Sequence, residues 1–211
     1  MKDYIEFPEK LFVTGTDTDV GKTVVSSLLL KGLSAGYWKP VQAGKTPQTD
    51  TEFVKKATGL AESHFYPERY CLDTPMSPHA AADIDGVEIS LNDFNLPYFT
   101  QQHLVVEGAG GLIVPLNEKD TVLDLIEQFG LPVLLVARSG LGTLNHTFLS
   151  LMALRNRNID IFGVLLNGPL HKSNYETILE MGRPRYLFQL EMLKNITPSN
   201  LEKAFLKIFS R

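Results

Sequence analysis

Apolar runs typical of strands alternate with helical patterns along the whole chain, and this alternation is the feature that most restricts its fold. Leu11–Val13 is apolar and is followed by helical spacing over Gly21–Leu33, while Ile161–Leu166 follows a helical pattern at Thr143–Arg155. Strands that alternate with helices form βαβ units, because a crossover is needed to bring two strands parallel. The sequence therefore predicts one α/β domain over residues 1–211, with a mostly parallel central sheet and helices on both faces.

The middle of the chain is predicted to hold less regular elements. Tyr37–Val41 is typical of a strand, with Pro40 at its end or on an edge strand, because proline cannot donate to a sheet ladder. A helix is expected over Asp50–Ala57, ended by Gly59. Prolines and a glycine interrupt residues 64–89, which predicts a long surface loop with one helical turn. The remaining predicted elements are strands at His103–Glu107 and Pro132–Val136, a helix at Asp120–Phe129, and helices capped by Ser90 with Asp93 and by Ser199 with Glu202.

The composition excludes several classes of protein. The 211 residues carry a net charge of −4, so the chain has no basic footprint for nucleic acid. The single cysteine, Cys71, rules out a disulfide framework and a thiolate metal cluster, and it fits a reducing compartment. The longest apolar run, Leu131–Ala137, is far shorter than the roughly 20 residues of a membrane helix. The first residues lack the apolar core of a signal peptide, so we expect a cytoplasmic protein that binds neither nucleic acid nor a membrane.

The strongest local motif is LFVTGTDTDVGKTVV, in which an apolar strand runs through a turn into a helix. Backbone N–H groups of such a loop point at phosphate oxygens, and the helix start adds its positive dipole end. Lys22 can reach the β- and γ-phosphates, and the Thr23 hydroxyl can bind Mg²⁺. The spacing departs from the common P-loop pattern, because Thr16 occupies the position of the first glycine. The motif predicts nucleotide binding; Asp17 and Asp19 either shape the loop or are solvated in its turn, and for Asp17 we favour solvation.

Glu107 ends the predicted strand HLVVE, and the glycine-rich segment Gly108–Gly111 follows at once. A P-loop enzyme usually takes a further carboxylate from a neighbouring strand to hold Mg²⁺, and ligands of open α/β sheets bind outside the carboxyl ends of strands. The glycines let the backbone approach a ligand closely. The alternative is a glycine-rich turn beside a surface glutamate. Asp50 in QTDTE is a weaker candidate, for which a helix N-cap is an equally good interpretation.

Lys39 lies in the apolar segment YWKPVQAG. Lysine is seldom fully buried without a partner. At the end of a strand beside a phosphate site, a lysine could bind an anion or stabilise developing charge. From these residues alone, a lysine on an edge strand that extends its ammonium to water is the favoured interpretation.

Taken together, the motifs resemble those of dethiobiotin synthetases, P-loop enzymes that convert 7,8-diaminopelargonate, CO₂ and ATP to dethiobiotin in biotin biosynthesis. The resemblance covers most of residues 11–167. It implies a single-domain P-loop NTPase-like fold, Mg²⁺ as cofactor, ATP as co-substrate, and a homodimer in which the second subunit completes the substrate site. The resemblance rests on FVTGTDTDVGKT, KPVQAG, the TD of QTDT, SPHAAA, VVEGAGGLIVPL, LPVLLVARSGLGTLNH and GVLLNG, in the order of the family.

The resemblance also implies a role for each matching residue. Lys22 would bind the phosphates, and Lys39 would be the catalytic lysine that stabilises the substrate carbamate and its attack on the γ-phosphate. The metal ligands would be Thr23, Asp50 and Glu107. The nucleotide would contact Asp19, Val20, Gly21, Lys22, Thr23, Val24, Asp50, Glu107, Gly108, Ala109, Gly110, Asn167 and Gly168, with Asn167 at the adenine. The substrate would contact Thr18, Lys39 and Ala43 and, from the second subunit, Gly142, Thr143, Leu144 and Asn145.

Three features depart from the family's pattern. Ala43 replaces a residue that often carries a hydroxyl, so a substrate hydrogen bond is expected to be lost or moved. The stretch between Thr23 and Lys39 is short, which suggests a trimmed first helix. The strand end that borders adenine corresponds to LFQLEML, with Glu191 where proline is expected, so base recognition is expected to differ.

A nucleotide switch of the chromosome-partition or division-site type is the main alternative, because it shares the sheet and a deviant P-loop. Those switches carry a signature lysine early in the loop, where this chain has Asp17. A related amide-forming ligase would need an added glutaminase domain, which 211 residues cannot hold. A non-catalytic binding protein is supported only by the altered adenine segment.

Overall fold

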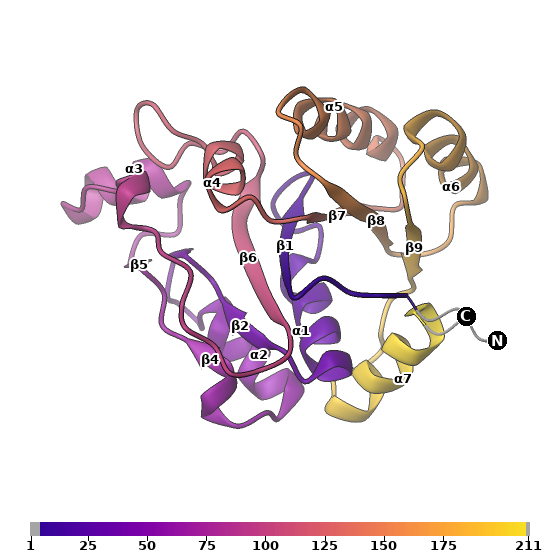
Figure 1. Cartoon of the computed structure of the whole chain (residues 1–211), viewed down its shortest axis with the longest axis horizontal. Coiled ribbons are helices and arrows are strands. Elements are labelled where there is room, and N and C mark those ends of the chain that lie inside the picture. Colours follow the sequence, from indigo (N-terminus) through magenta and orange to yellow (C-terminus); the bar gives the residue numbers. More distant parts are fainter. Residues whose placement is uncertain (1–4, 210–211) are drawn as a thin grey trace.

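A parallel sheet of seven strands forms the centre of the protein, as a computed structural model that describes residues 5–209 shows (Figure 1). The order is β4-β2-β6-β1-β7-β8-β9, and each neighbouring pair runs parallel. The predicted α/β class is thus confirmed. The strands are β1 (Lys10–Gly15), β2 (Gly36–Trp38), β4 (Phe65–Tyr66), β6 (Leu104–Gly111), β7 (Val133–Arg138), β8 (Ile161–Asn167) and β9 (Leu187–Leu190).

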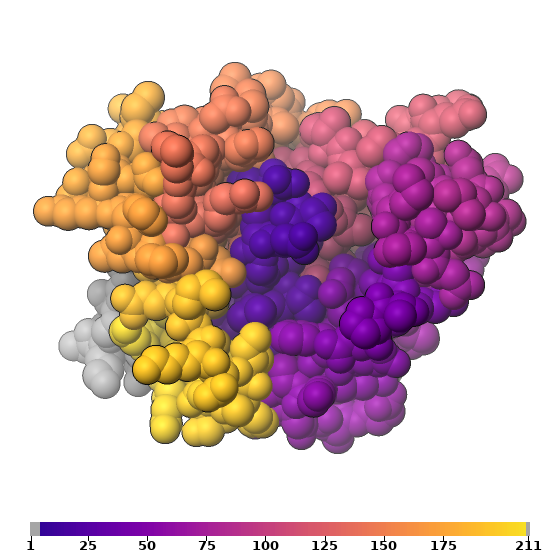
Figure 2. Space-filling view, turned by 180° about the vertical axis from the view of Figure 1, so that it is seen from behind, coloured from indigo at the N-terminus to yellow at the C-terminus, as the bar shows by residue number. Residues whose placement is uncertain are grey.

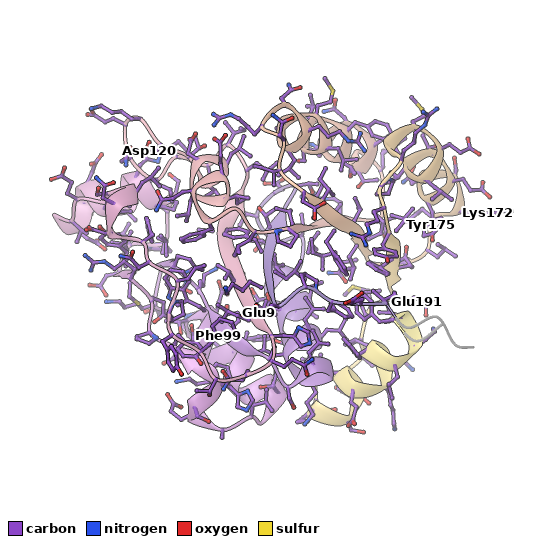
Figure 3. All side chains as sticks on the ribbon, in the orientation of Figure 1. Glu9, Phe99, Asp120, Lys172, Tyr175 and Glu191 are labelled. Atoms are coloured by element: carbon purple, nitrogen blue, oxygen red, sulfur yellow. The ribbon has the colours of Figure 1, made fainter. Side chains whose placement is uncertain are left out.

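Helices cover both faces of the sheet (Figure 1). One face packs against α1 (Lys22–Leu33), α2 (Asp50–Thr58) and α7 (Pro198–Phe209), which share a core with the aromatic rings of Phe162 and Phe188. The other face packs against α4 (Val122–Phe129), α5 (Thr143–Asn156) and α6 (Lys172–Thr177). At the outer edge Tyr175 points from α6 to the sheet, where its hydroxyl donates to the Leu187 carbonyl over 3.1 Å (Figure 3). None of the helices in residues 5–209 is long and apolar enough to cross a membrane.

The topology puts the loop after β1 at the middle of one sheet edge. β1 lies between β6 and β7, with Val13 opposite Glu107 on one side and Leu134 on the other. The carboxyl ends of parallel strands share one edge, where open α/β sheets bind ligands. The P-loop, which we define as residues 16–21, therefore lies beside the ends of two strands that are distant in sequence.

The predicted strand Tyr37–Val41 is wrong in its extent, because the chain leaves the main sheet after Trp38. β3 (Val41–Ala43) instead pairs with β5 (Tyr70–Leu72) in a separate two-stranded parallel sheet. Pro40 stands at the break, since it has no N–H for a ladder, and its carbonyl accepts the backbone N–H groups of Arg69 and Tyr70, each at 3.0 Å.

The prediction of a long surface loop at residues 64–89 is also wrong. The segment contains β4, β5 and the helix α3 (Pro78–Asp85). Pro78 is the first helical residue, where its missing N–H costs nothing. Gly86 ends the helix in a left-handed conformation, with φ of 67°. Pro78 and Gly86, which the sequence suggests as interruptions, thus mark the two ends of a helix.

Several predicted caps and ends shift by one or a few residues. Thr49, and not Asp50, is the N-cap of α2, and it forms a capping box with Glu52. The last helix begins at Pro198, before the predicted cap Ser199. Ser90 precedes only a short 3₁₀ turn at Leu91–Asp93. The predicted strand His103–Glu107 continues through its glycines as β6 (Leu104–Gly111).

Candidate active site

A cleft of about 710 Å³ opens at the carboxyl edge of the sheet. Its walls are the P-loop with the start of α1, the segment from Lys39 to Asp50, the start of α3, and the glycine-rich end of β6. The space-filling view places the indigo P-loop segment at the centre of one face, between the magenta and the orange parts of the chain (Figure 2). Thr18, Lys39 and Ala43, which were predicted to bind substrate, all line this cleft.

The P-loop lines the cleft with Thr18, Asp19 and Gly21. Gly21 has φ of 97° and Asp19 has φ of 57°, and both positive values curl the loop around the start of α1. α1 has no side-chain cap, so the first N–H groups of the helix are available to an anion. Lys22 reaches back along the loop and donates to the Asp17 carbonyl over 3.0 Å. The loop therefore has the geometry of a phosphate cradle.

Asp17 is exposed, as the favoured interpretation of a solvated turn residue expects, and it also makes two contacts. One oxygen, Oδ1, accepts the backbone N–H of Thr18 over 2.7 Å. The other, Oδ2, pairs with Nη2 of Arg138, at the end of β7, over 3.1 Å. The position that carries a signature lysine in partition-type switches thus holds an acid in an ion pair within the same chain.

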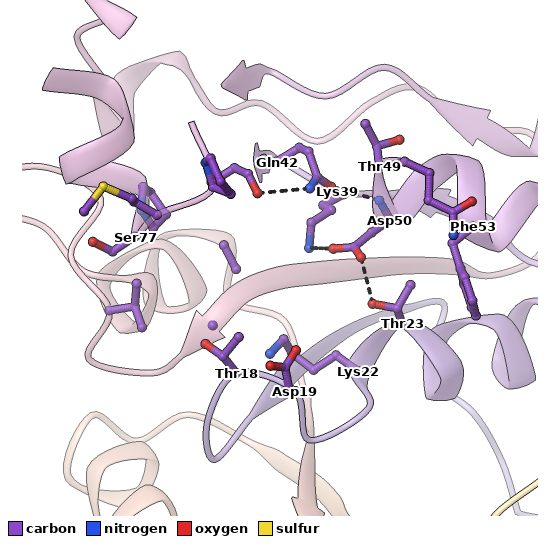
Figure 4. A pocket seen from close by; sticks show the side chains of 18 of the residues that line it. Thr18, Asp19, Lys22, Thr23, Lys39, Gln42, Thr49, Asp50, Phe53 and Ser77 are labelled. Carbon is purple, nitrogen blue, oxygen red and sulfur yellow. Dashed lines mark hydrogen bonds and ion pairs between the residues drawn. The ribbon is translucent and has the colours of Figure 1, made fainter. Parts of the chain in front are cut away.

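Thr23 and Asp50, two of the predicted metal ligands, line the cleft and lie close together (Figure 4). The third, Glu107, is buried directly behind them. The Thr23 hydroxyl lies 3.0 Å from Glu107 Oε1 and 3.2 Å from Asp50 Oδ1. Mg²⁺ prefers oxygen ligands and is commonly held by one or two carboxylates together with substrate phosphates. The donor set fits such an ion. It is not an all-protein metal cage, since residues 5–209 contain no group of three or more His, Cys, Asp and Glu suited to a metal.

Lys39 is buried and paired, so the interpretation as a lysine that extends to water is wrong. Its side chain is 3% exposed. Its ammonium lies 2.8 Å from Asp50 Oδ2 and 3.3 Å from Glu107 Oε1, and 3.4 Å from the Gly108 carbonyl. Burial alone would lower the pKa of Lys39, but the two carboxylates more than offset this and raise it. Lys39 is therefore a fixed cation at the wall of the cleft.

The charge of Lys39 also affects the pKa values of Lys22 and Asp50. Burial, and next the positive charge of Lys39, lower the pKa of Lys22. Burial tends to raise the pKa of Asp50, but the ammonium of Lys39 overrides it and lowers the pKa below the usual range. Asp50 is consequently ionised at neutral pH, as a metal ligand must be.

Glu107 is completely buried, so it is not a surface residue beside a glycine turn. It lies within β6, and the strand continues to Gly111. Gly108 is needed because a Cβ there would lie 2.8 Å from the Phe12 ring. Ala109 and Gly110 follow and line the cleft.

Two side chains that the sequence did not single out hold the carboxylates in place. Tyr37 donates its hydroxyl to Glu107 Oε2 over 3.1 Å, and burial followed by the charge of Glu107 raises the pKa of this phenol well above its usual value. Gln42 accepts the backbone N–H of Asp50 over 3.0 Å and donates to the Gly44 carbonyl over 2.8 Å. Alternation along YWKPVQ would have placed Tyr37 on the same face as Lys39, which is the signal that could have identified it.

Asn167 and Gly168, the predicted adenine contacts, lie at the end of β8 behind the P-loop and do not line the cleft. The side-chain amide of Asn167 donates to the Val20 carbonyl over 3.0 Å. A Cβ at Gly21 would lie 2.0 Å from this amide nitrogen, so Gly21 allows the close contact. In this chain Asn167, predicted to bind the base, therefore supports the P-loop through its contact with Val20.

The predicted carboxylate site at Gly142–Asn145 also lies outside the cleft. Gly142 is the N-cap of α5, with φ of 88°. Thr143 is buried, its hydroxyl lies 3.3 Å from that of Thr147, and its N–H donates to the Gly140 carbonyl. Asn145 is exposed on the surface of α5.

Comparisons with known proteins identify the family. A model described as an AAA domain matches residues 9–200. The ATP-dependent dethiobiotin synthetase of Bradyrhizobium diazoefficiens is 46% identical over 93% of this chain and 93% of its own length. The enzyme of the same name from Afipia carboxidovorans is 45% identical over 95% and 96%. That from Brucella ovis is 44% identical over 95% and 94%.

The solved structures show a similar fold. A ParA family ATPase from Chlorobium tepidum superposes with a TM-score of 0.51 at 12% identity, covering 95% of this chain and 92% of that chain. At so low an identity the likeness concerns the fold alone. The near-complete coverage at 44–46% identity, together with the P-loop cleft, shows that this chain is an enzyme of the ATP-dependent dethiobiotin synthetase family.

Proposed function

We propose that the protein closes the ureido ring of dethiobiotin in the cytoplasm, using 7,8-diaminopelargonate, CO₂ and ATP and releasing ADP and phosphate. The observation that carries the proposal is the position of Lys39. It is a buried cation beside two carboxylates, and it lines the same cleft as Lys22, the first residue of α1 after the P-loop. A site for joining an anionic carbamate to a phosphate needs fixed positive charge at both groups and no nucleophile from the protein.

ATP is assigned to the P-loop side of the cleft. The amides of residues 19–24 and the Lys22 ammonium would hold the phosphates, while Asn167 and Gly168 would border the base. Glu107–Gly110 would line the path between nucleotide and substrate. One N–H of the Asn167 amide donates to Val20, and its side-chain oxygen would accept a hydrogen bond from the base.

Mg²⁺ is assigned to Thr23, Asp50 and Glu107, whose oxygens converge below the phosphate cradle. When bound, the ion would neutralise charge on the β- and γ-phosphates. A hydroxyl that donates a hydrogen bond to a carboxylate keeps its lone pairs for a cation. The contacts of Thr23 therefore already orient its hydroxyl oxygen as a metal ligand.

The substrate amine first forms an N-carbamate with CO₂. A carbamate oxygen attacks the γ-phosphorus and ADP leaves, which gives a carbamic-phosphoric anhydride. The second amine then attacks the carbonyl carbon, phosphate is expelled, and the ring closes. Lys39 would bind the carbamate oxygens and stabilise the charge that develops as they approach the phosphate. Thr18 and Ala43 would contact the substrate beside Lys39.

We assign the remaining part of the substrate site to a second copy of the chain. Gly142–Asn145 lie at a helix start, which suits a carboxylate, but within one chain they do not line the cleft. Leu141, Leu149 and Met152 extend this surface of α5 with exposed apolar side chains. A homodimer through α5 would bury them and bring Asn145 to the cleft of its partner.

The test is phosphate release from ATP with bicarbonate, with and without 7,8-diaminopelargonate. We expect release to depend strictly on the diamine and dethiobiotin to form in equal amount. Diamine-independent hydrolysis would instead support a partition-type switch and contradict the proposal. The same assay with CTP and GTP would show whether LFQLEML, with Glu191, alters base selection.

A further inference from the structure

The two oxygens of the buried Glu107 carboxylate have different partners. Oε1 lies 3.0 Å from the Thr23 hydroxyl and 3.3 Å from the Lys39 ammonium, both of which face the cleft. Oε2 accepts from the hydroxyl of Tyr37 over 3.1 Å. Among the described residues Tyr37 is the one donor recorded at Oε2. Its bond therefore decides which oxygen of Glu107 is left to face Thr23 and Lys39.

Tyr37 is itself held rigidly by the sheet. Its position in β2 pairs with Val105 in β6, and both side chains lie in the core on the face covered by α1. Glu107 lies two residues further along β6, so alternation places its side chain on the same face. The ring is fully buried and lies 6.3 Å from that of Phe65, edge to face. A phenol fixed in this way can hold a carboxylate whose own terminal torsion is broad.

We infer that Tyr37 is a positioning residue for the Mg²⁺ complex of ATP. By occupying Oε2 it keeps Oε1 of Glu107 as the acceptor for the Thr23 hydroxyl, whose lone pairs are then free for the cation. The inference rests on the proposed assignment of Thr23, Asp50 and Glu107 to Mg²⁺. Partners of this kind are important in metal sites, where their loss typically costs about 10–100-fold in metal affinity.

The test is Tyr37→Phe, which removes one oxygen and keeps the packing against Phe65. Binding of Mn²⁺, in place of Mg²⁺, would be measured by electron paramagnetic resonance with a non-hydrolysable ATP analogue present. We expect Mn²⁺ to bind about tenfold more weakly, and the Mg²⁺ concentration for half-maximal turnover to rise by a similar factor. Tyr70→Phe is the matched control, because the Tyr70 hydroxyl also donates to a carboxylate, that of Asp93, away from the cleft.

A purely structural role would lower the midpoint of thermal unfolding and leave Mn²⁺ affinity at the wild-type value, and this result would overturn the inference. The comparison is repeated in a Glu107→Gln background, in case Tyr37→Phe alone is unstable. The side chain at position 107 is then neutral, so removal of the Tyr37 hydroxyl does not take a hydrogen bond from a buried carboxylate. There, Tyr37→Phe should have little further effect on Mn²⁺ binding, whereas a second tenfold loss would contradict action through Glu107. Mn²⁺ binding needs no diamine, so this result is independent of the substrate proposal.

Discussion

At the residue scale, the charge state of Lys39 follows from its two neighbours. Removing an ammonium from water costs several kcal/mol, and a buried lysine without a partner tends to lose its proton. Asp50 and Glu107 reverse that tendency, so the pKa of Lys39 lies above its usual value although the side chain is buried. A group with a raised pKa stays charged through neutral pH, which suits binding of an anion and not removal of a proton.

Lys39→Met is expected to lower kcat by about 100-fold or more, as loss of a charge-stabilising donor does in other enzymes. ATP binding, which depends on the P-loop, should persist in calorimetry. Lys45→Met is the control, because Lys45 is exposed and pairs with Asp73 over 2.7 Å. Turnover of Lys39→Met at the wild-type rate would show that Lys39 has no catalytic role.

At the scale of elements, the packing of α1 against α7 overrides local helix preference. Gly32 lies in the last turn of α1, where alanine is intrinsically favoured by about 1 kcal/mol. A Cβ at this position would lie 2.1 Å from the ring of Phe205 in α7. The nearest atom is the ring Cγ, next to the backbone of Phe205, and the ring packs against those of Phe7 and Phe209. The glycine is therefore a contact residue between two helices.

Gly32→Ala is therefore expected to destabilise the protein by about 1–3 kcal/mol, the usual cost of overpacking. Urea unfolding measures the change. In a Phe205→Ala background the clash is absent, and the same substitution should stabilise by about 0.5–1 kcal/mol through helix preference. If Gly32→Ala stabilised the otherwise unchanged protein, the packing explanation would be wrong.

At the scale of the whole molecule, one exposed face of α5 is suited to contact a second copy of the chain in the proposed homodimer. Asn145, Leu149 and Met152 recur at helical spacing, and all are exposed. The face therefore combines a predicted substrate contact with apolar side chains that a monomer leaves in water. A second chain seated there would both bury the apolar surface and complete the cleft.

We expect Leu149→Glu to convert the proposed dimer to a monomer, as light scattering after size exclusion would show. Diamine-dependent turnover should fall while ATP binding is kept, because the P-loop lies within one chain. Leu206→Glu on α7 is the control, since Leu206 is 55% exposed and Leu149 is 56% exposed. A wild-type monomer with full activity would contradict the assembly.

Much of the fold could be predicted because it depends on local patterns. The spacing of apolar residues located β1, β7 and β8, and the order GKT after a strand located the start of α1. Residues 64–89 could not be assigned, because Pro78 and Gly86 delimit a helix just as readily as they interrupt one. The break after Trp38 was missed because Pro40 permits both a strand end and an exchange between sheets.

The sequence by itself determined the α/β class, the P-loop and the residue types of the site, because spacing along one chain specifies each of them. Only the tertiary structure decided that Lys39 is a buried cation, that Glu107 is fully enclosed, and that Tyr37 holds it. These properties depend on which strands become neighbours. β2 and β6 are separated by a long stretch of chain, and their pairing is what brings the phenol to the carboxylate.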